Sequence, residues 1–105
     1  MSDESVILVN LLKVEPAKQA ALIALLKQNT ETVVCTLHGW KSTRLIAAKD
    51  GGAVIIYSEW QTSAAVEAMR GDQRMQAYLP KITELATLDS VVGSTVLSET
   101  RSQRS

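Results

Sequence analysis

Two strand-like runs carry apolar side chains on both of their alternating faces, and few folds can bury such runs. In VILVNLLKV (residues 6–14), apolar residues occupy both parities, with Val6, Leu8 and Leu12 on one and Ile7, Val9 and Leu11 on the other. The run AVIIYSEW (residues 53–60) repeats the pattern. Successive side chains of a strand point to opposite faces, and a sheet with one wet face alternates apolar and polar residues. Both faces of this sheet must therefore be covered.

The order of the remaining elements predicts what covers one of those faces. Glu15-Pro16 ends the first run, because proline disfavours helical geometry in the residue before it and suits a first helical turn. The predicted elements are strand 6–14, helix 17–37, strand 40–48, strand 53–60, helices 63–69 and 72–85, and strand 91–97. This β-α-β-β-α-β order predicts an α+β, ferredoxin-like split β-α-β fold, in which helices cover one face of a four-stranded antiparallel sheet.

The second apolar face has no further layer in the chain to cover it. At 105 residues the chain is long enough for one domain and too short for two cores, and we expect its core at about residues 6–97 and a flexible polar tail at 99–105. A second copy of the chain supplies the missing cover most simply. We therefore expect a homodimer with its two sheets face to face.

Charge and cysteine content exclude several classes of protein. Eleven acidic residues balance eleven basic ones, and the basic residues are scattered, so no nucleic-acid partner is expected. Cys35 is the single cysteine, which excludes a disulfide framework. No apolar run approaches the roughly twenty residues of a membrane span, and the N-terminal MSDES carries acids where a secretory signal needs bases. We expect a cytoplasmic protein without a membrane partner.

Few residues remain that could carry chemistry. One histidine and one cysteine cannot assemble the usual metal sites, so no metal is expected, and no glycine-rich nucleotide motif or GxSxG turn is present. His38 precedes Gly39 at an expected helix end, where a cation favours the helix dipole, and its alternative role is a catalytic base. Cys35 is interpreted as a small core residue, with a nucleophile as the alternative. Met69 and Met75 are interpreted as fillers of core gaps, with substrate contacts as the alternative.

Asn10 and Trp60 differ from the other polar and aromatic residues. Asn10 has the parity of Leu8 and Leu12, so its amide projects into apolar surroundings, and Trp60 closes the strand expected beside the first one. Both side chains could reach one cavity. Alternatively, Asn10 bonds a nearby backbone group and Trp60 is core bulk. The residues alone leave both interpretations open.

Three segments together resemble a known family. VNLLKV, then IIYSEW followed by QTSAAV, and later YLPKITEL are similar to segments of the antibiotic biosynthesis monooxygenase family. The resemblance covers about residues 6–97 and implies a dimeric α/β barrel. It is nearest to enzymes without cofactors that oxidise anthrones or naphthacenones to quinones with molecular oxygen. In those enzymes a first-strand asparagine and a tryptophan ending the third strand are implicated in catalysis, and they fall on Asn10 and Trp60.

The resemblance implies a small aromatic substrate, such as an anthrone or naphthol, and no cofactor. The substrate contacts that we expect are Leu8, Leu12, Ile56, Met69 and Tyr78, although Tyr78 has an alternative role in packing. Ile56 stands where some quinone-forming relatives have a polar residue, which leaves the substrate open. The pocket Trp and His of the haem-degrading branch fall near Met69 and Leu79, which disfavours haem degradation.

Two other functions stay open at this point. One is a quinol oxygenase or an isomerase of a small metabolite within the same superfamily. The other is a dimeric ligand-binding module that keeps the pocket without turnover.

Overall fold

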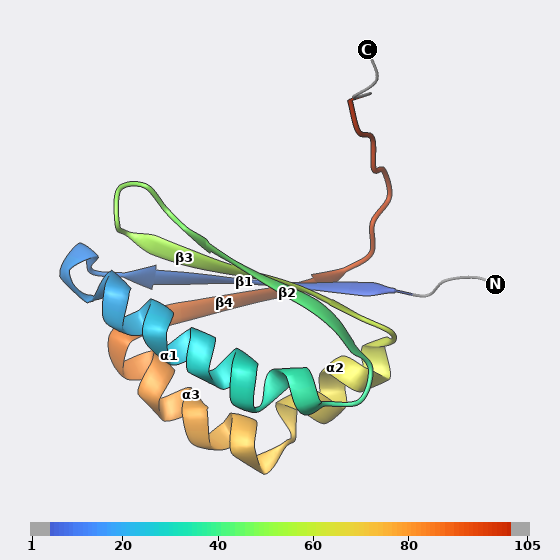
Figure 1. Cartoon of the computed structure of the whole chain (residues 1–105), viewed down its shortest axis with the longest axis horizontal. Helices are drawn as coiled ribbons and strands as arrows, with labels where there is room; N and C mark the ends of the chain where they lie inside the picture. Colours follow the sequence, from blue (N-terminus) through green and yellow to red (C-terminus); the bar gives the residue numbers. More distant parts are fainter. Residues whose placement is uncertain (1–4, 102–105) are drawn as a thin grey trace.

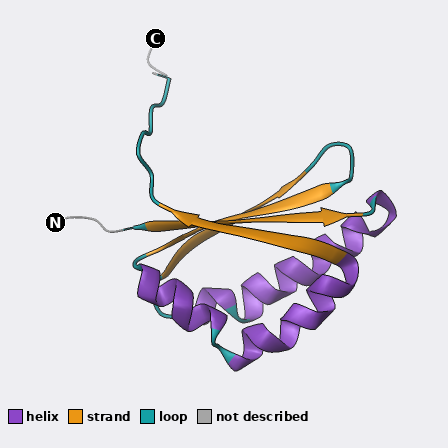
Figure 2. Ribbon diagram, turned by 180° about the vertical axis from the view of Figure 1, so that it is seen from behind, coloured by secondary structure: helices purple, strands orange, loops and turns teal. Residues whose placement is uncertain are grey.

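The computed structural model describes residues 5–101 and has two layers, a sheet and a set of helices on one of its faces (Figure 1). The four strands lie in the order β2-β3-β1-β4. The elements are β1 (Val6–Val14), η1 (Pro16–Lys18), α1 (Gln19–Thr32), η2 (Val34–Thr36), β2 (Trp40–Ala47), β3 (Ala53–Trp60), α2 (Ser63–Arg70), α3 (Gln73–Leu85) and β4 (Ala86–Gly93). Seen from behind, the three α-helices still lie on one side of the sheet (Figure 2). The ferredoxin-like prediction is confirmed.

The central strand β1 pairs with β3 on one side and with β4 on the other, and both pairings are antiparallel. Asn10 stands opposite Ile56 on β3 and Ser90 on β4. Paired residues share a face of the sheet, so all three side chains belong to the face that the helices cover. The predicted parity of Asn10 with Leu8 and Leu12 is confirmed, because both leucines are buried under the helices.

The hairpin between β2 and β3 follows its turn residues. Gly51 adopts a φ of 84°, which favours glycine, and the Asp50 carboxylate accepts the Gly52 N–H at 2.8 Å. The chain reverses there and Ala48 donates its N–H to the Ala53 carbonyl at 3.0 Å. The strands predicted at 40–48 and 53–60 are therefore joined as a hairpin.

The prediction of one continuous helix over residues 17–37 is wrong. This segment is divided into η1, α1 and η2, and α1 ends at Thr32 because Val33 leaves helical geometry with φ −121° and ψ −61°. Val33 and Val34 are nevertheless buried, so the apolar spacing continues past the end of the helix. The predicted burial of Cys35 is also wrong, since this residue is exposed and its Sγ donates to the Glu31 carbonyl at 3.2 Å.

The fourth strand begins five residues earlier than the predicted range of 91–97. Helix α3 ends at Leu85, and Ala86 is already extended, with φ −152° and ψ 159°, so the chain enters β4 without a loop. Residues 94–101 continue beyond the last pairing with β1, and they leave the sheet on the side away from the helices (Figure 2). Val96 and Leu97, whose apolar character suggests a strand, are 95% and 73% exposed.

Side-chain caps define the starts of helices α2 and α3. The Thr62 hydroxyl accepts the Ala65 N–H at the start of α2, and Asp72 accepts the N–H groups of Arg74 and Met75 at the start of α3. The side-chain hydrogen bond from Arg74 lowers the pKa of Asp72, and the backbone hydrogen bonds from Arg74 and Met75 act in the same direction. Helix α3 continues through Pro80.

The sheet face turned away from the helices carries several apolar side chains beside the charged Arg44 and Asp89. It presents Ile46 at 42%, Tyr57 at 38% and Val91 at 65% exposure. The structure thus reproduces the apolar second face that the sequence indicates. Within residues 5–101, the helices are too short and too polar for any of them to cross a membrane.

Candidate functional site

A cavity of about 320 Å³ lies between the sheet and the helices. Its walls come from β1, β3 and β4 on one side and from the three α-helices on the other. Nine of its lining residues are apolar, and the five polar ones are Asn10, Asn29, Arg70, Gln76 and Ser90. An apolar pocket with a few polar groups is the usual form of a small-molecule site, and this volume is near the lower end of the usual range of about 300–1,000 Å³.

Asn10 reaches this cavity from the centre of the sheet. The Ser90 hydroxyl donates a hydrogen bond to its Oδ1, across the register that pairs the two residues. Among residues 5–101, no group accepts a hydrogen bond from the Asn10 Nδ2. The arrangement holds the carbonyl end of the amide in place and leaves the N–H end available to a ligand.

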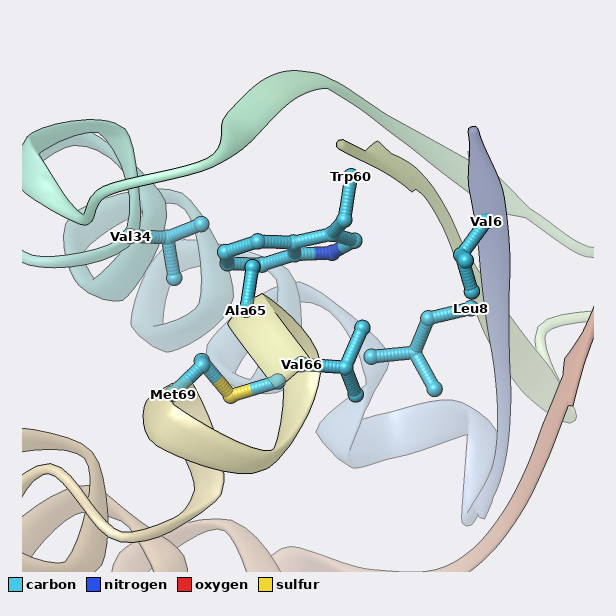
Figure 3. Close-up of a cluster of buried hydrophobic side chains, with 7 residues drawn as sticks. All are labelled: Val6, Leu8, Val34, Trp60, Ala65, Val66 and Met69. Atoms are coloured by element: carbon cyan, nitrogen blue, oxygen red, sulfur yellow. The ribbon is translucent and has the colours of Figure 1, made fainter. Parts of the chain in front are cut away.

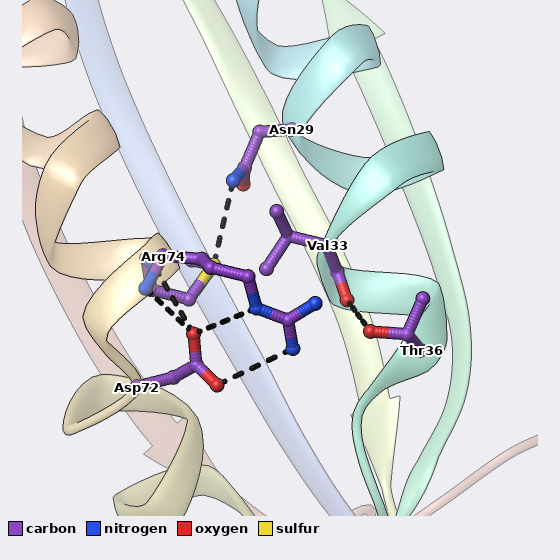
Figure 4. A network of polar contacts seen from close by, with 6 residues as sticks. Asn29, Val33, Thr36, Asp72 and Arg74 are labelled. Atoms are coloured by element: carbon purple, nitrogen blue, oxygen red, sulfur yellow. Dashed lines mark hydrogen bonds and ion pairs between the residues drawn. The ribbon is translucent and has the colours of Figure 1, made fainter.

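Asn29 lines the cavity from the opposite wall, on α1. It is 5% exposed, and its Nδ2 donates to the Met75 sulfur at 3.4 Å (Figure 4). Sequence reasoning missed this residue, although a signal existed, because Asn29 shares helical spacing with the buried Leu22, Leu26 and Val33. Ser90 could not be found in the same way, since it lies outside the strand predicted at 91–97.

Trp60 is not among the residues that line the cavity. It is 1% exposed in a packed cluster with Val6, Leu8, Val34, Ala65, Val66 and Met69 (Figure 3). Its Nε1 donates to the Ser58 hydroxyl at 3.0 Å, and that hydroxyl donates to the Leu8 carbonyl at 3.3 Å. The indole N–H is therefore used within the protein.

The strand geometry explains why Asn10 and Trp60 do not meet. Both face the helices, but Asn10 pairs with Ile56, whereas Trp60 pairs with Val6. Trp60 thus lies four residues farther along β3, which is about 13 Å at a rise of about 3.3 Å per residue. The two candidates share a face without sharing the cavity.

The expected substrate contacts divide into two groups. Leu8, Leu12, Ile56 and Met69 line the cavity, as does Met75. Tyr78 does not line it. This residue packs against the core, and the Lys81 ammonium lies 5.5 Å from its ring centroid. His38 lies outside the cavity lining as well.

The charges around the cavity are few. Arg70 lines it and forms an ion pair with Glu67 at 3.3 Å, but no Asp, Glu or His is among the described residues of its lining. Within residues 5–101, no group of three or more His, Cys, Asp or Glu side chains could hold a metal ion. A larger hollow of about 690 Å³ at the end of the sheet, beside Glu59 and Ser63, is more open and mostly polar, so it is the poorer site for an apolar ligand.

The comparisons with known proteins agree with this architecture. A curated relative, tetracenomycin-F1 monooxygenase of Streptomyces glaucescens, is 35% identical over 71 residues. The alignment covers 68% of this chain, and the chain spans 63% of the length of that relative.

Two solved structures have the same fold. Rv0793 from Mycobacterium tuberculosis superposes with a TM-score of 0.78 at 22% identity, over 92% of this chain and 100% of that one. SnoaB from Streptomyces nogalater, described as a cofactor-independent oxygenase, superposes with a TM-score of 0.77 at 15% identity, over 90% of this chain and 96% of that one.

The match at the level of the family extends over most of the chain. Residues 5–81 match the sequence profile described as antibiotic biosynthesis monooxygenase. This range includes β1 to β3, α1, α2 and most of α3, and therefore most of the cavity lining. The chain belongs to the antibiotic biosynthesis monooxygenase family.

Proposed function

We propose that this protein is a cofactor-independent monooxygenase that oxidises a hydroxylated aromatic compound, of the anthrone or naphthol kind, to a quinone with molecular oxygen. One observation carries the proposal. Asn10 presents an N–H without a protein partner among residues 5–101 to an otherwise apolar cavity, while Ser90 holds the other end of its amide. The names of the relatives, a tetracenomycin-F1 monooxygenase and a cofactor-independent oxygenase, support the same reaction class.

The reaction needs little from the protein, because the substrate supplies all the electrons. Loss of a proton from the reacting carbon of an anthrone, or from the hydroxyl group of a naphthol, gives an electron-rich enolate or phenolate, which transfers one electron to oxygen. The two radicals then combine and form a carbon–oxygen bond. The oxygen–oxygen bond of the resulting peroxide breaks, one oxygen atom remains as the new carbonyl, and the other leaves as water with two hydrogens of the substrate. Both hydrogens come from the reacting carbon of an anthrone, and a naphthol supplies one from that carbon and one from its hydroxyl group. The substrate loses four electrons and dioxygen gains four.

The cavity residues have three tasks in this scheme. The Asn10 N–H donates to the oxygen on which the enolate charge develops, and removal of one such donor typically costs about 10²–10³ in rate. The apolar walls hold the rings and exclude water. Arg70, which is ion-paired with Glu67, lines the cavity and has further N–H groups that can donate to an anionic substrate. Since the described lining lacks a carboxylate or an imidazole, we assign the proton acceptor to water.

Oxygen consumption tests the proposal directly. Metal-free wild-type protein is mixed with a panel of anthrones and naphthols, and oxygen uptake and quinone absorbance are recorded beside Asn10→Ala and Gln28→Ala. We expect Asn10→Ala to lower kcat by about 10²–10³, and the exposed Gln28, outside the cavity lining, to leave it unchanged. No uptake above the spontaneous rate by the wild type would refute the proposal. Binding without uptake would favour the ligand-binding module.

We further propose that two copies pair through the uncovered sheet face. The support is the apolar character of this face, with Ile46, Tyr57 and Val91 exposed in one chain. Val9 lies on the same face at the centre of the sheet, opposite Tyr57 and Val91. The change Val9→Lys should convert a dimer to a monomer in light scattering after size exclusion. A monomeric wild type at the same concentration would refute the pairing.

A further inference from the structure

The cavity contains a polar side chain that has no role in the proposed oxidation. Among the described residues, Asn29 and Ser58 are the two buried polar ones. The Ser58 hydroxyl accepts the Trp60 N–H and donates to the Leu8 carbonyl. Asn29 is 5% exposed, lines the cavity, and makes one side-chain hydrogen bond within residues 5–101, to Met75.

The sulfur of Met75 fixes which end of the Asn29 amide faces the cavity. A thioether can accept a hydrogen bond but has no hydrogen to donate. The Nδ2 therefore points to the sulfur, at 3.4 Å, as the dashed line from Asn29 shows (Figure 4). This leaves the Oδ1 without a donor among residues 5–101. The oxygen is not sealed in the interior, because every fully buried side-chain N or O atom of that region has a partner.

The Asn29 amide stands where the spacing of α1 would place an apolar residue, because it continues the spacing of the buried Leu22 and Leu26. Its Oδ1 is not fully buried, so water can donate to this oxygen when the cavity holds no ligand. A ligand that covers the Oδ1 without a donor leaves a buried acceptor unsatisfied, at a cost of about 1–3 kcal/mol. A ligand hydroxyl that donates to the Oδ1 avoids this cost.

We propose that Asn29 is a substrate-recognition residue whose Oδ1 accepts the hydrogen of a ligand hydroxyl group. The inference rests on the proposed function and adds a requirement to its substrate class. Asn10 offers an N–H from the sheet, and Asn29 offers an oxygen from α1 on the opposite wall. The cavity therefore selects a small aromatic ligand that carries an oxygen acceptor toward the sheet and an O–H toward α1.

A cycle of ligand and side-chain changes tests this assignment. Dissociation constants of 2-naphthol and naphthalene are measured by calorimetry without oxygen, for the wild type and for Asn29→Leu. The ratio of the two constants should change by about 2- to 12-fold in favour of naphthalene on substitution, which is the contribution of one neutral hydrogen bond. Asn29→Asp retains an acceptor and should keep the wild-type preference. The exposed Gln28, one residue earlier on α1, gives the matched control Gln28→Leu, which should leave the ratio unchanged.

A measurement on the wild type avoids dependence on the folding of the variants. The side-chain carbonyl carbon of Asn29, observed by NMR, should shift when 2-naphthol is added and much less with naphthalene. An unchanged ratio in a folded Asn29→Leu, or equal shifts with both ligands, overturns the assignment. If the wild type takes up oxygen but Asn29→Leu does not change the ratio of the two dissociation constants, the proposed reaction stands and the assignment of Asn29 fails. A change of this ratio without oxygen uptake overturns the reaction alone, and absence of 2-naphthol binding overturns the assignment of Asn29.

Discussion

Replacing Trp60 with Phe separates a packing role of this residue from direct participation in the reaction. Trp60 is 1% exposed, ends β3 beside Val6, and donates its indole N–H to Ser58 at 3.0 Å. Phenylalanine keeps most of the ring volume and removes the donor. The structure therefore predicts a loss of stability with little loss of turnover.

The magnitude follows from two contributions. The hydrogen bond to Ser58 is worth about 0.5–1.5 kcal/mol. Truncation of a buried aromatic to alanine costs about 3–5 kcal/mol, and the smaller change to phenylalanine removes about a third of that, roughly 1–1.5 kcal/mol. The sum is about 1.5–3 kcal/mol, and for a domain of this size each kcal/mol lowers Tm by about 4–8 °C.

Urea unfolding at a fixed protein concentration measures the free energy of unfolding, and oxygen uptake well below Tm measures kcat. Trp40→Phe is the matched control, because Trp40 also donates to a hydroxyl, that of Thr43 at 2.8 Å, but is only half-buried. We expect a smaller loss of stability from this control. We also expect Trp60→Phe to keep kcat within about tenfold, against the roughly 10²–10³ assigned to the donor of Asn10. Unchanged stability with a fall in kcat of about a hundredfold, the size expected for a lost donor, would refute the packing role.

Three further predictions concern stability. Gly39→Ala should lower the free energy of unfolding in urea by more than about 1–2 kcal/mol, because Gly39 has a φ of 88° and an added Cβ would lie 2.5 Å from that of Ala65. The control Gly71→Ala should change the free energy of unfolding little, because Gly71 has a negative φ and the new Cβ would make only ordinary contacts. Asp72 has a lowered pKa, so its stabilising contribution is present above its ordinary pKa of 3.8 and is lost as pH falls through the pKa of the folded state. Asp72→Asn should abolish this part of the pH dependence of the free energy of unfolding, and an unchanged dependence would contradict the reasoning. Pro80→Ala should raise stability by about 1–3 kcal/mol, since the exposed Pro80 removes a hydrogen bond inside α3, and a lower Tm would show that the ring packs.

Local chemistry in the sequence was enough for most of the fold. The apolar runs of β1 and β3 and the proline that ends the first run act over a few residues, so the amino-acid sequence alone reveals them. The same reasoning placed Asn10 on the helix-covered face, and the spacing along α1 could have placed Asn29 there too. The prediction of one helix over 17–37 was wrong because Val33 stays buried, as the apolar spacing indicates, but no longer has helical φ and ψ angles.

The strand register determined how far apart the candidate residues lie, which the spacing of side chains along the chain does not give. Parity told which face Asn10 and Trp60 share, but the pairing of Asn10 with Ile56 and of Trp60 with Val6 set their separation along the sheet. The same register brought Ser90 opposite Asn10, from a strand whose start depends on where α3 ends. The elements and their faces follow from side-chain periodicity, so the order of amino acids is enough to infer them. Which amides face one cavity depends on contacts between residues as far apart as Asn10 and Ser90, and these contacts form only when the chain is folded.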